Sequence, residues 1–152
     1  MELPAQLVPA PGTAARGRYE QVTCCLLSEM DAQALWIHRK HEAPEVTHLL
    51  GGPVPAAVAH AREWFDKVMD VLAAELAASG GPYLLGDMFS PADILLVHCL
   101  QWAQGIGWWP GDDEAVPPKM RGVAAYLARC KERPAYQRTL ARAREETEPP
   151  KL

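Results

Sequence analysis

The segment Phe89–Ile94 constrains the fold of this chain more than any other part of the sequence. It combines several signals that start a helix. Ser90 is a favourable N-cap, Pro91 suits the first helical position, and Asp93 can accept from the Ser90 amide in a capping box. A hydrophobic staple across this start is predicted from the two apolar residues that flank the cap, Phe89 and Ile94. The segment therefore predicts a firmly fixed helix N-terminus.

The helix that this segment starts, residues 90–108, has almost no polar face. Its apolar positions are Ile94, Leu95, Leu96, Val97, Cys99, Leu100, Trp102 and Ile106. A helix that is apolar all round is buried all round, so we expect it to be the central helix of a bundle. The capped start fits this place, because amides at a buried helix end have no water to bind.

Four further helices are predicted around it, at residues 13–41, 55–79, from 118 and from 134. The first two carry apolar stripes at three- and four-residue spacing: Val22, Leu26, Met30, Ala34 and Ile37, then Val58, Ala61, Phe65, Val68, Leu72 and Leu76. No segment has a strand pattern. The predicted fold class is all-α, a five-helix bundle, with a linker-like leader (1–12), a helical domain (13–146) and a flexible tail (147–152).

Composition and charge exclude several partners. The chain has 152 residues, 49% of them hydrophobic, and a net charge of −4. No apolar run approaches the ~20 residues of a membrane span, and the N-terminus does not resemble a secretory signal, so we expect a cytoplasmic protein without a membrane partner. The acidic balance argues against a nucleic-acid partner, because phosphate binding needs a clustered basic face.

The cysteines and histidines do not predict a metal site. Cys24 and Cys25 are adjacent while Cys99 and Cys130 stand alone, so we interpret all four as reduced thiols. His38 and His41 are three residues apart, but they run into a proline-containing loop, which is a poor frame for a rigid metal site. No metal is expected.

Several segments together resemble cytosolic glutathione transferases, especially bacterial ones. They are the motif at residues 86–93, the apolar helix after it, residues 126–127 with 133–136, the proline-rich residues 9–13, and residues 28–30. The resemblance runs from about Leu7 to Ala143 and concerns the helical C-terminal domain of that family. Its specificity comes from several unrelated segments that agree in order.

The resemblance implies a hydrophobic-substrate-binding and dimerisation domain. In the family, a thioredoxin-like domain binds glutathione and activates its thiol, and this chain starts where the interdomain linker would be. We therefore expect no catalytic residue here, no bound cofactor and no activity of the chain alone, with glutathione as the co-substrate of a complete enzyme. The implied partners are a hydrophobic small molecule and either a second copy, in a dimer, or a thioredoxin-like domain.

The resemblance also implies which residues line a hydrophobic cleft. The candidates are Asp31, Trp102, Gln104, Gly105 and Trp108. In so apolar a helix Trp102 can belong to the core or to the cleft. Trp108 and Trp109 can wall a pocket or pack under the acidic loop that follows. Ser90 and Asp93 are assigned to folding.

Two other functions stay open at this point. Helical domains of this fold also act as non-catalytic protein–protein interaction modules, which would expose an apolar patch of several hundred square ångströms. A weaker alternative is a small-molecule carrier that uses the same cleft without chemistry.

Overall fold

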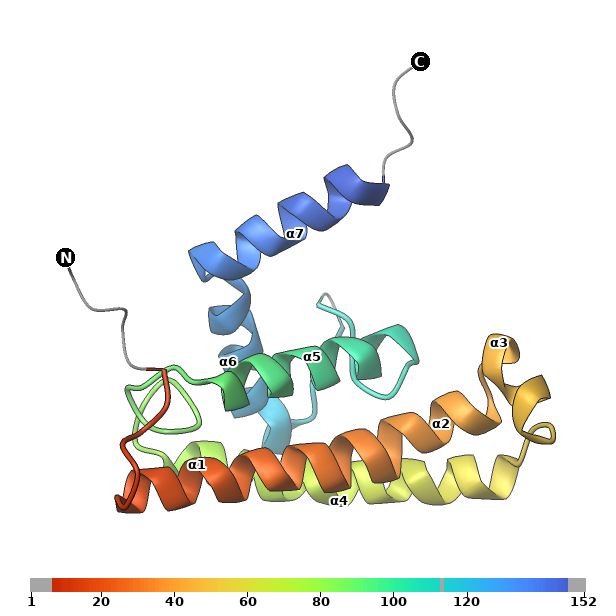
Figure 1. Ribbon diagram of the computed structural model, residues 1–152, viewed down its shortest axis with the longest axis horizontal. Helices are drawn as coiled ribbons and strands as arrows, with labels where there is room; N and C mark the ends of the chain where they lie inside the picture. Colours follow the sequence, from red (N-terminus) through yellow and green to blue (C-terminus); the bar gives the residue numbers. More distant parts are fainter. Residues whose placement is uncertain (1–6, 113, 148–152) are drawn as a thin grey trace.

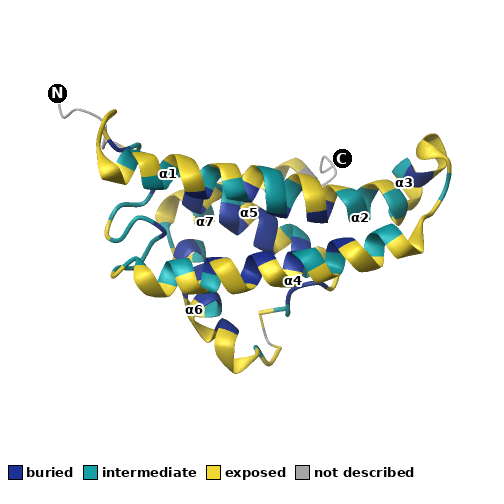
Figure 2. Cartoon of the chain, turned by 90° about the horizontal axis from the view of Figure 1, so that it is seen from below, coloured by how far each residue is buried: buried dark blue, intermediate teal, exposed yellow. Residues whose placement is uncertain are grey.

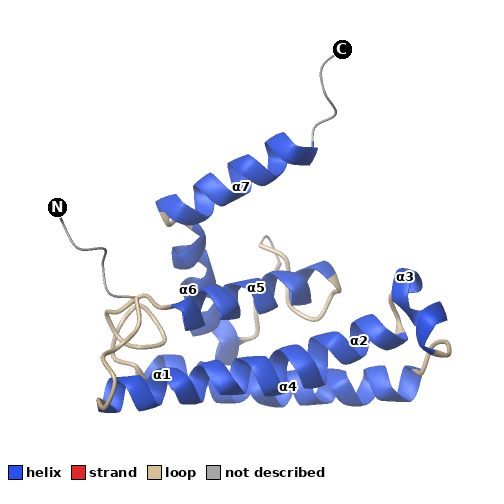
Figure 3. Cartoon of the chain, in the orientation of Figure 1, coloured by secondary structure: helices blue, strands red, loops and turns tan. Residues whose placement is uncertain are grey.

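The computed structural model describes residues 7–112 and 114–147, and its described part consists of helices and loops without a strand (Figure 3). All five predicted helices are present. The first is a continuous rod of α1 (Ala14–Cys25), the π-helical η1 (Leu26–Leu35) and α2 (Trp36–His41). The others are α4 (Pro55–Ala78), α5 (Pro91–Gly105), α6 (Arg121–Lys131), preceded by the short η3 (Pro118–Met120), and α7 (Pro134–Thr147). The predicted tail lies outside the described residues from 148 onward, as do residues 1–6 of the predicted leader.

The loop predicted after the first helix contains two short turns of helix, α3 (Pro44–Thr47) and η2 (His48–Leu50). Pro44 occupies the first turn of α3, where its missing N–H costs nothing. Gly51 then ends the segment with a φ of 90°, a left-handed conformation that glycine adopts without strain. These turns reverse the chain between α2 and α4.

The first rod and α4 run antiparallel, and α5 runs alongside them, in roughly the direction of the rod (Figure 1). Val22, Leu26, Met30 and Ala34 of the rod are buried, at the four-residue spacing read from the sequence. The facing side of α4 buries Ala61, Phe65, Val68, Met69 and Leu72. Figure 2 shows that the most deeply buried side chains gather on α5, between the rod and α4.

A buried carboxylate holds the start of α5. Asp93 is fully buried, and Ser90 and Asp93 form the reciprocal contacts of a capping box. Oδ2 of Asp93 accepts hydrogen bonds from the Ser90 amide at 2.8 Å and the Ser90 hydroxyl at 3.0 Å. Its Oδ1 accepts from the Leu84 amide and from the Tyr126 hydroxyl, each at 3.0 Å. One side chain therefore joins the loop before α5, α5 itself and α6.

The central helix is less completely enclosed than its sequence predicts. Ala92, Leu96, Cys99, Leu100 and Ala103 are fully buried. One stripe is open, however: Ile94 is 55% exposed, and His98 and Gln101 are also exposed. The stripe is open because α7, which could cover it, leaves the body of the molecule at an angle (Figure 1). The Phe89–Ile94 staple stays a prediction, since Ile94 faces this open side.

Candidate ligand-binding site

A pair of tryptophans joins the first rod to the central helix. Trp36 begins α2 and Trp102 lies in the last turns of α5, and their ring centroids are 5.7 Å apart in an edge-to-face contact. Trp36 is 37% exposed, and Trp102 is partly buried against the core. Aromatic pairs of this geometry stabilise beyond their buried area and offer apolar surface to a ligand. The pair is the candidate binding site.

Two basic or ionisable side chains border the pair. The guanidinium of Arg39 lies over the Trp36 ring, 5.0 Å from its centroid. The imidazole of His98 lies 6.2 Å from the Trp102 ring. The surface around the tryptophans is thus apolar with a cationic edge, which suits a planar ligand that carries electron-withdrawing or anionic groups.

Asp31 lies on η1, on the first rod, and is partly buried. Burial raises the pKa of the Cys99 thiol to about 12, and the charge of Asp31 adds to that rise. Asp31 therefore lies near enough to α5 to influence it. Its predicted role in lining a cleft stays a prediction.

Gln104 and Gly105 lie at the end of α5, next to the acidic loop. The Gln104 side-chain amide donates to the Pro110 carbonyl at 2.9 Å and to Oδ1 of Asp112 at 3.0 Å. Lys131 donates to both Asp112 carboxylate oxygens, at 2.7 and 3.0 Å. It also donates to the side-chain oxygen Oε1 of Gln104 at 3.3 Å. These bonds fasten the loop to α5 and α6. Gly105 beside them is exposed.

Trp108 and Trp109 differ in their places: Trp109 both walls a recess and packs under the acidic loop, whereas Trp108 does neither. Trp108 is buried against α2 and α4, with its ring centroid 5.1 Å from His38 and 5.6 Å from Phe65. Trp109 instead lines a recess of about 280 Å³ under the acidic loop, together with Gln104 and Asp112. The five predicted cleft residues therefore occupy different places: only Trp102 lies in the tryptophan pair.

Trp36 was not among the candidates read from the sequence. It directly follows Leu35 and lies outside the apolar stripe of the first helix, so it was not expected to be buried. A large aromatic residue off the buried stripe of a helix was the available signal, because such residues gather at binding surfaces. What the sequence could not show is that Trp36 meets Trp102.

Three of the cysteines, Cys25, Cys99 and Cys130, have thiols whose pKa is shifted away from the reactive range. Burial is the largest cause that raises the pKa of Cys25 and of Cys130, the latter to about 11. A nucleophilic thiol needs the opposite shift, toward the thiolate. Within residues 7–112 and 114–147 no three His, Cys, Asp or Glu side chains are grouped as metal ligands. His38 instead contacts Glu42 at 3.3 Å and packs on Trp108.

The helix order and the buried capping carboxylate define an all-helical domain, and the half-exposed tryptophan pair is its candidate ligand site. Residues 55–129 match the family model described as the glutathione S-transferase C-terminal domain. The chain thus has the fold of that domain and resembles the glutathione transferase family. No curated protein matches it significantly.

Solved structures agree with this fold. A glutathione transferase from Methylococcus capsulatus is 27% identical, with a TM-score of 0.63, over 86% of this chain and 55% of that one. Glutathione S-transferase III in its apo form is 26% identical, with a TM-score of 0.61, over 97% of this chain and 62% of that one. FzlA from C. crescentus, at 18% identity and a TM-score of 0.68 over 89% and 56%, shares the fold. The chain thus spans somewhat more than half the length of these proteins. No described helix is both long and apolar enough to cross a membrane.

Proposed function

We propose that this chain is the apolar-ligand-binding half of a glutathione transferase-like protein and works with a thioredoxin-like glutathione-binding domain. The observation that carries the proposal is the contact between Trp36 and Trp102. Trp102 belongs to the end of the central helix, one of the segments that hold the electrophile in the family that the chain resembles. Trp36 lies near the end of the first helix, whereas the family uses the start of that helix, so its part in the site rests on the contact alone. The family match and the 27% identical transferase support the same assignment.

The chain's share of the chemistry is to hold and orient the electrophile. Positioning a substrate beside its attacking group removes much of the entropic barrier to reaction. Activation of the glutathione thiol is assigned to the partner domain, because burial raises the pKa of Cys25, Cys99 and Cys130 in this chain. As part of the proposal we place the protein in the cytoplasm, where its four free cysteines would stay reduced.

A conjugation assay with glutathione and 1-chloro-2,4-dinitrobenzene tests this division of work. We expect no turnover above background by the purified 152-residue chain, and no retention on immobilised glutathione. Activity should appear only when a thioredoxin-like domain of a related transferase is added or fused. Clear glutathione-dependent turnover by the chain without that domain would contradict the proposal.

The electrophile site is tested separately with 1,3-dinitrobenzene, which lacks a leaving group. We expect this compound to quench tryptophan fluorescence and to bind at least about fivefold more weakly to Trp36→Ala and Trp102→Ala, as the loss of an aromatic contact of about 1 kcal/mol or more implies. Trp64→Phe is the matched control. Trp64 lies on α4 and donates to Glu29 at 3.1 Å, away from the pair. Equal dinitrobenzene binding by all three variants would show that the tryptophan pair is not the binding site.

A specific surface favours the second candidate, a non-catalytic interaction module. Leu49 is 71% exposed, Leu50 is 50% exposed and Val54 is 43% exposed, all at the turn between α2 and α4. Exposed apolar side chains that cluster in this way mark protein interfaces. The double substitution Leu49→Glu and Leu50→Glu should abolish self-association in sedimentation experiments if this turn forms the contact. It should leave dinitrobenzene binding unchanged.

A further inference from the structure

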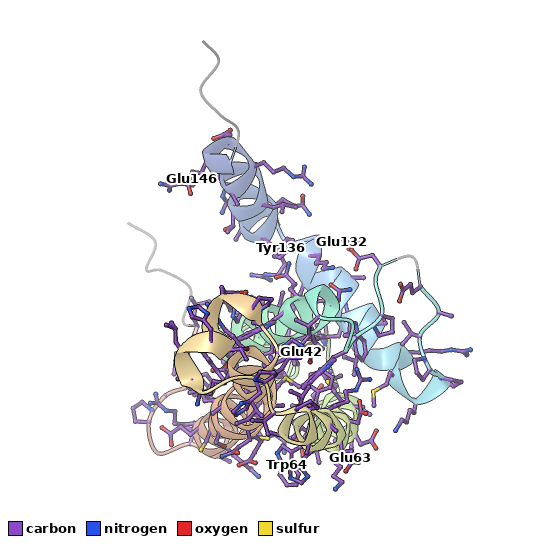
Figure 4. All side chains as sticks on the ribbon, turned by 90° about the vertical axis from the view of Figure 1, so that its right-hand side faces the viewer. Glu42, Glu63, Trp64, Glu132, Tyr136 and Glu146 are labelled. Atoms are coloured by element: carbon purple, nitrogen blue, oxygen red, sulfur yellow. The ribbon has the colours of Figure 1, made fainter. Side chains whose placement is uncertain are left out.

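A second groove lies between α5 and the junction of α6 with α7, and His98 lines it as well as bordering the tryptophan pair. Its volume is about 310 Å³, at the lower end of the range for small-molecule sites. Phe89, Ile94 and Val97 form one wall, and Cys130, Arg133 and Tyr136 form the other. Figure 4 shows Tyr136 where α7 joins the body of the molecule, on the opposite side from Trp64. The groove exists because α7 turns away from α5 instead of covering it (Figure 1).

A fixed cation stands in this apolar wall. The guanidinium of Arg133 stacks over the Phe89 ring at 3.6 Å from its centroid and donates to the Tyr83 hydroxyl at 2.9 Å. Tyr83 in turn packs edge to face on Phe89 at 5.3 Å. These contacts hold the guanidinium in one place, so little side-chain entropy remains to be lost when it binds a ligand.

Within the described structure, the guanidinium of Arg133 has no carboxylate as an ion-pair partner. No described Asp or Glu forms an ion pair with it, and no acidic side chain lines the groove as far as the described residues go. Only one of its five N–H donors is used by Tyr83. In a chain of net charge −4, such a cation beside apolar side chains selects an anionic ligand.

Further polar side chains complete the groove, namely His98, Gln101, Tyr136 and Thr139. Gln101 donates to the Tyr136 hydroxyl at 2.6 Å, so that hydroxyl keeps its own proton for another acceptor. The exposed Ile94 supplies apolar surface that costs energy to leave in water. An aromatic body on Ile94, Val97 and Phe89 would thus place a carboxylate within reach of Arg133.

We propose that the groove between α5 and the α6–α7 junction binds a small aromatic carboxylate, whose ring packs on Phe89, Ile94 and Val97 and whose carboxylate pairs with Arg133. A guanidinium matches a carboxylate in bidentate geometry, which favours this anion over a neutral analogue. Neither tryptophan of the pair lines this groove, although His98 lies next to both sites, and the proposal does not depend on the function proposed for the pair.

Isothermal titration calorimetry with naphthalene-2-carboxylate, at about pH 8, tests the site. A ligand of this size should bind with a Kd of about 0.1–1 mM. Naphthalene-2-carboxamide, which keeps the ring and loses the charge, should bind at least about tenfold more weakly. Arg133→Gln should remove this preference, while Arg129→Gln, whose guanidinium donates to the Pro82 carbonyl instead, should keep it.

A second pair of variants covers the case in which Arg133→Gln fails to fold. Ile94→Glu places a negative charge in the groove at a position that is 55% exposed, and should weaken carboxylate binding at least about tenfold. Val71→Glu makes the same change at a 53% exposed position on α4 and should bind as the parent does. Trp36→Ala changes the tryptophan pair at a residue that does not line the groove, and should also leave binding unchanged.

Three results would overturn the proposal: equal affinity for the carboxylate and the carboxamide, equal effects of Ile94→Glu and Val71→Glu, or loss of binding in Trp36→Ala. The last would mean that the probe sits on the tryptophan pair. Weakened dinitrobenzene binding in Trp36→Ala with intact naphthalene-2-carboxylate binding would separate the two sites.

Discussion

The hydroxyl of Tyr126 donates a hydrogen bond to Oδ1 of Asp93 at 3.0 Å and so joins α6 to the start of α5. Both residues are buried, Asp93 completely. Burial, followed by the charge of Asp93, raises the pKa of Tyr126, so the hydroxyl keeps the proton that it donates. Through this contact, the residue that caps α5 locally also links α5 to α6.

Tyr126→Phe should lower the free energy of unfolding by about 1.5–3 kcal/mol, because it removes one donor from a buried carboxylate. Asp93→Ala should cost more, since it leaves the Leu84 amide, the Ser90 amide and the Tyr126 hydroxyl without their acceptor. Urea denaturation followed by circular dichroism measures both.

Tyr136→Phe is the control for this pair. The Tyr136 hydroxyl accepts from Gln101 near solvent, so its loss should change stability by less than about 0.5 kcal/mol. A Tyr126→Phe protein as stable as Tyr136→Phe would show that the buried bond does not stabilise the fold.

Gly81→Ala should be destabilising by about 1–3 kcal/mol. A Cβ on Gly81 would lie 2.4 Å from the carbonyl carbon of Gly86, which is backbone and cannot rotate away. Tyr83 and Gly86 fix that close approach through two backbone hydrogen bonds, of 2.9 and 3.1 Å. Thermal unfolding gives the difference as a lowered Tm.

Gly122→Ala is the matched substitution, and it should raise the free energy of unfolding where Gly81→Ala lowers it. Gly122 is exposed in α6, and a Cβ there meets no atom within 4 Å. Alanine restricts the unfolded chain and suits a helix, so stability should rise by up to about 0.5–1 kcal/mol. Equal effects at the two glycines would contradict the clash at Gly81.

Cys24 should react faster with a thiol reagent than the other three cysteines. Cys24 is exposed, whereas Cys99 and Cys130 are buried and burial raises their pKa values to about 12 and about 11. At pH 8 a disulfide reagent such as Ellman's reagent should modify one thiol quickly in the native protein. All four should react in guanidinium chloride, and Cys24→Ser should lose the fast phase.

The pKa of Asp112 should depend on Lys131. A hydrogen bond from Lys131, then one from Gln104, lowers the pKa of this carboxyl in the folded protein. A lowered carboxyl pKa adds stability above the unfolded value of about 3.9, and that stability is lost as pH falls through the folded pKa. Carboxyl NMR titration of Lys131→Met should therefore find the Asp112 midpoint raised.

Lys119→Met serves as the control for the titration. Lys119 pairs with Asp70 at 2.6 Å, on another part of the surface, and should leave the Asp112 midpoint unchanged. A midpoint that moves equally in both variants would indicate a general charge effect and not the bond to Lys131.

The sequence was sufficient for the helices and their order because their signals are local. Thr13 caps α1 through a bond from the Arg16 amide, and Pro55, Pro91 and Pro134 each stand at the first position of their helix. The winding within the first rod was not predicted. Its four-residue apolar spacing drifts by about 40° per step in an α-helix, and the wider π-helical turn at Leu26–Leu35 reduces that drift.

The candidate site was predicted only in part. Trp102 was recognised through the family resemblance, but its partner Trp36 was not, and Gln104 was assigned to a cleft while it fastens the acidic loop. Side chains that meet from segments more than 60 residues apart depend on how helices rotate against one another, and helical periodicity does not give that rotation between segments.

By itself the sequence determined an all-helical chain with a capped central helix, because propensity, capping and apolar spacing act over a few residues. Only the tertiary structure decided that Asp93 also binds Leu84 and Tyr126, that Ile94 stays on an open side of α5, and that Trp36 lies against Trp102. Each of these depends on the packing of distant segments, which minimises exposed apolar area for the whole chain and not for any one helix.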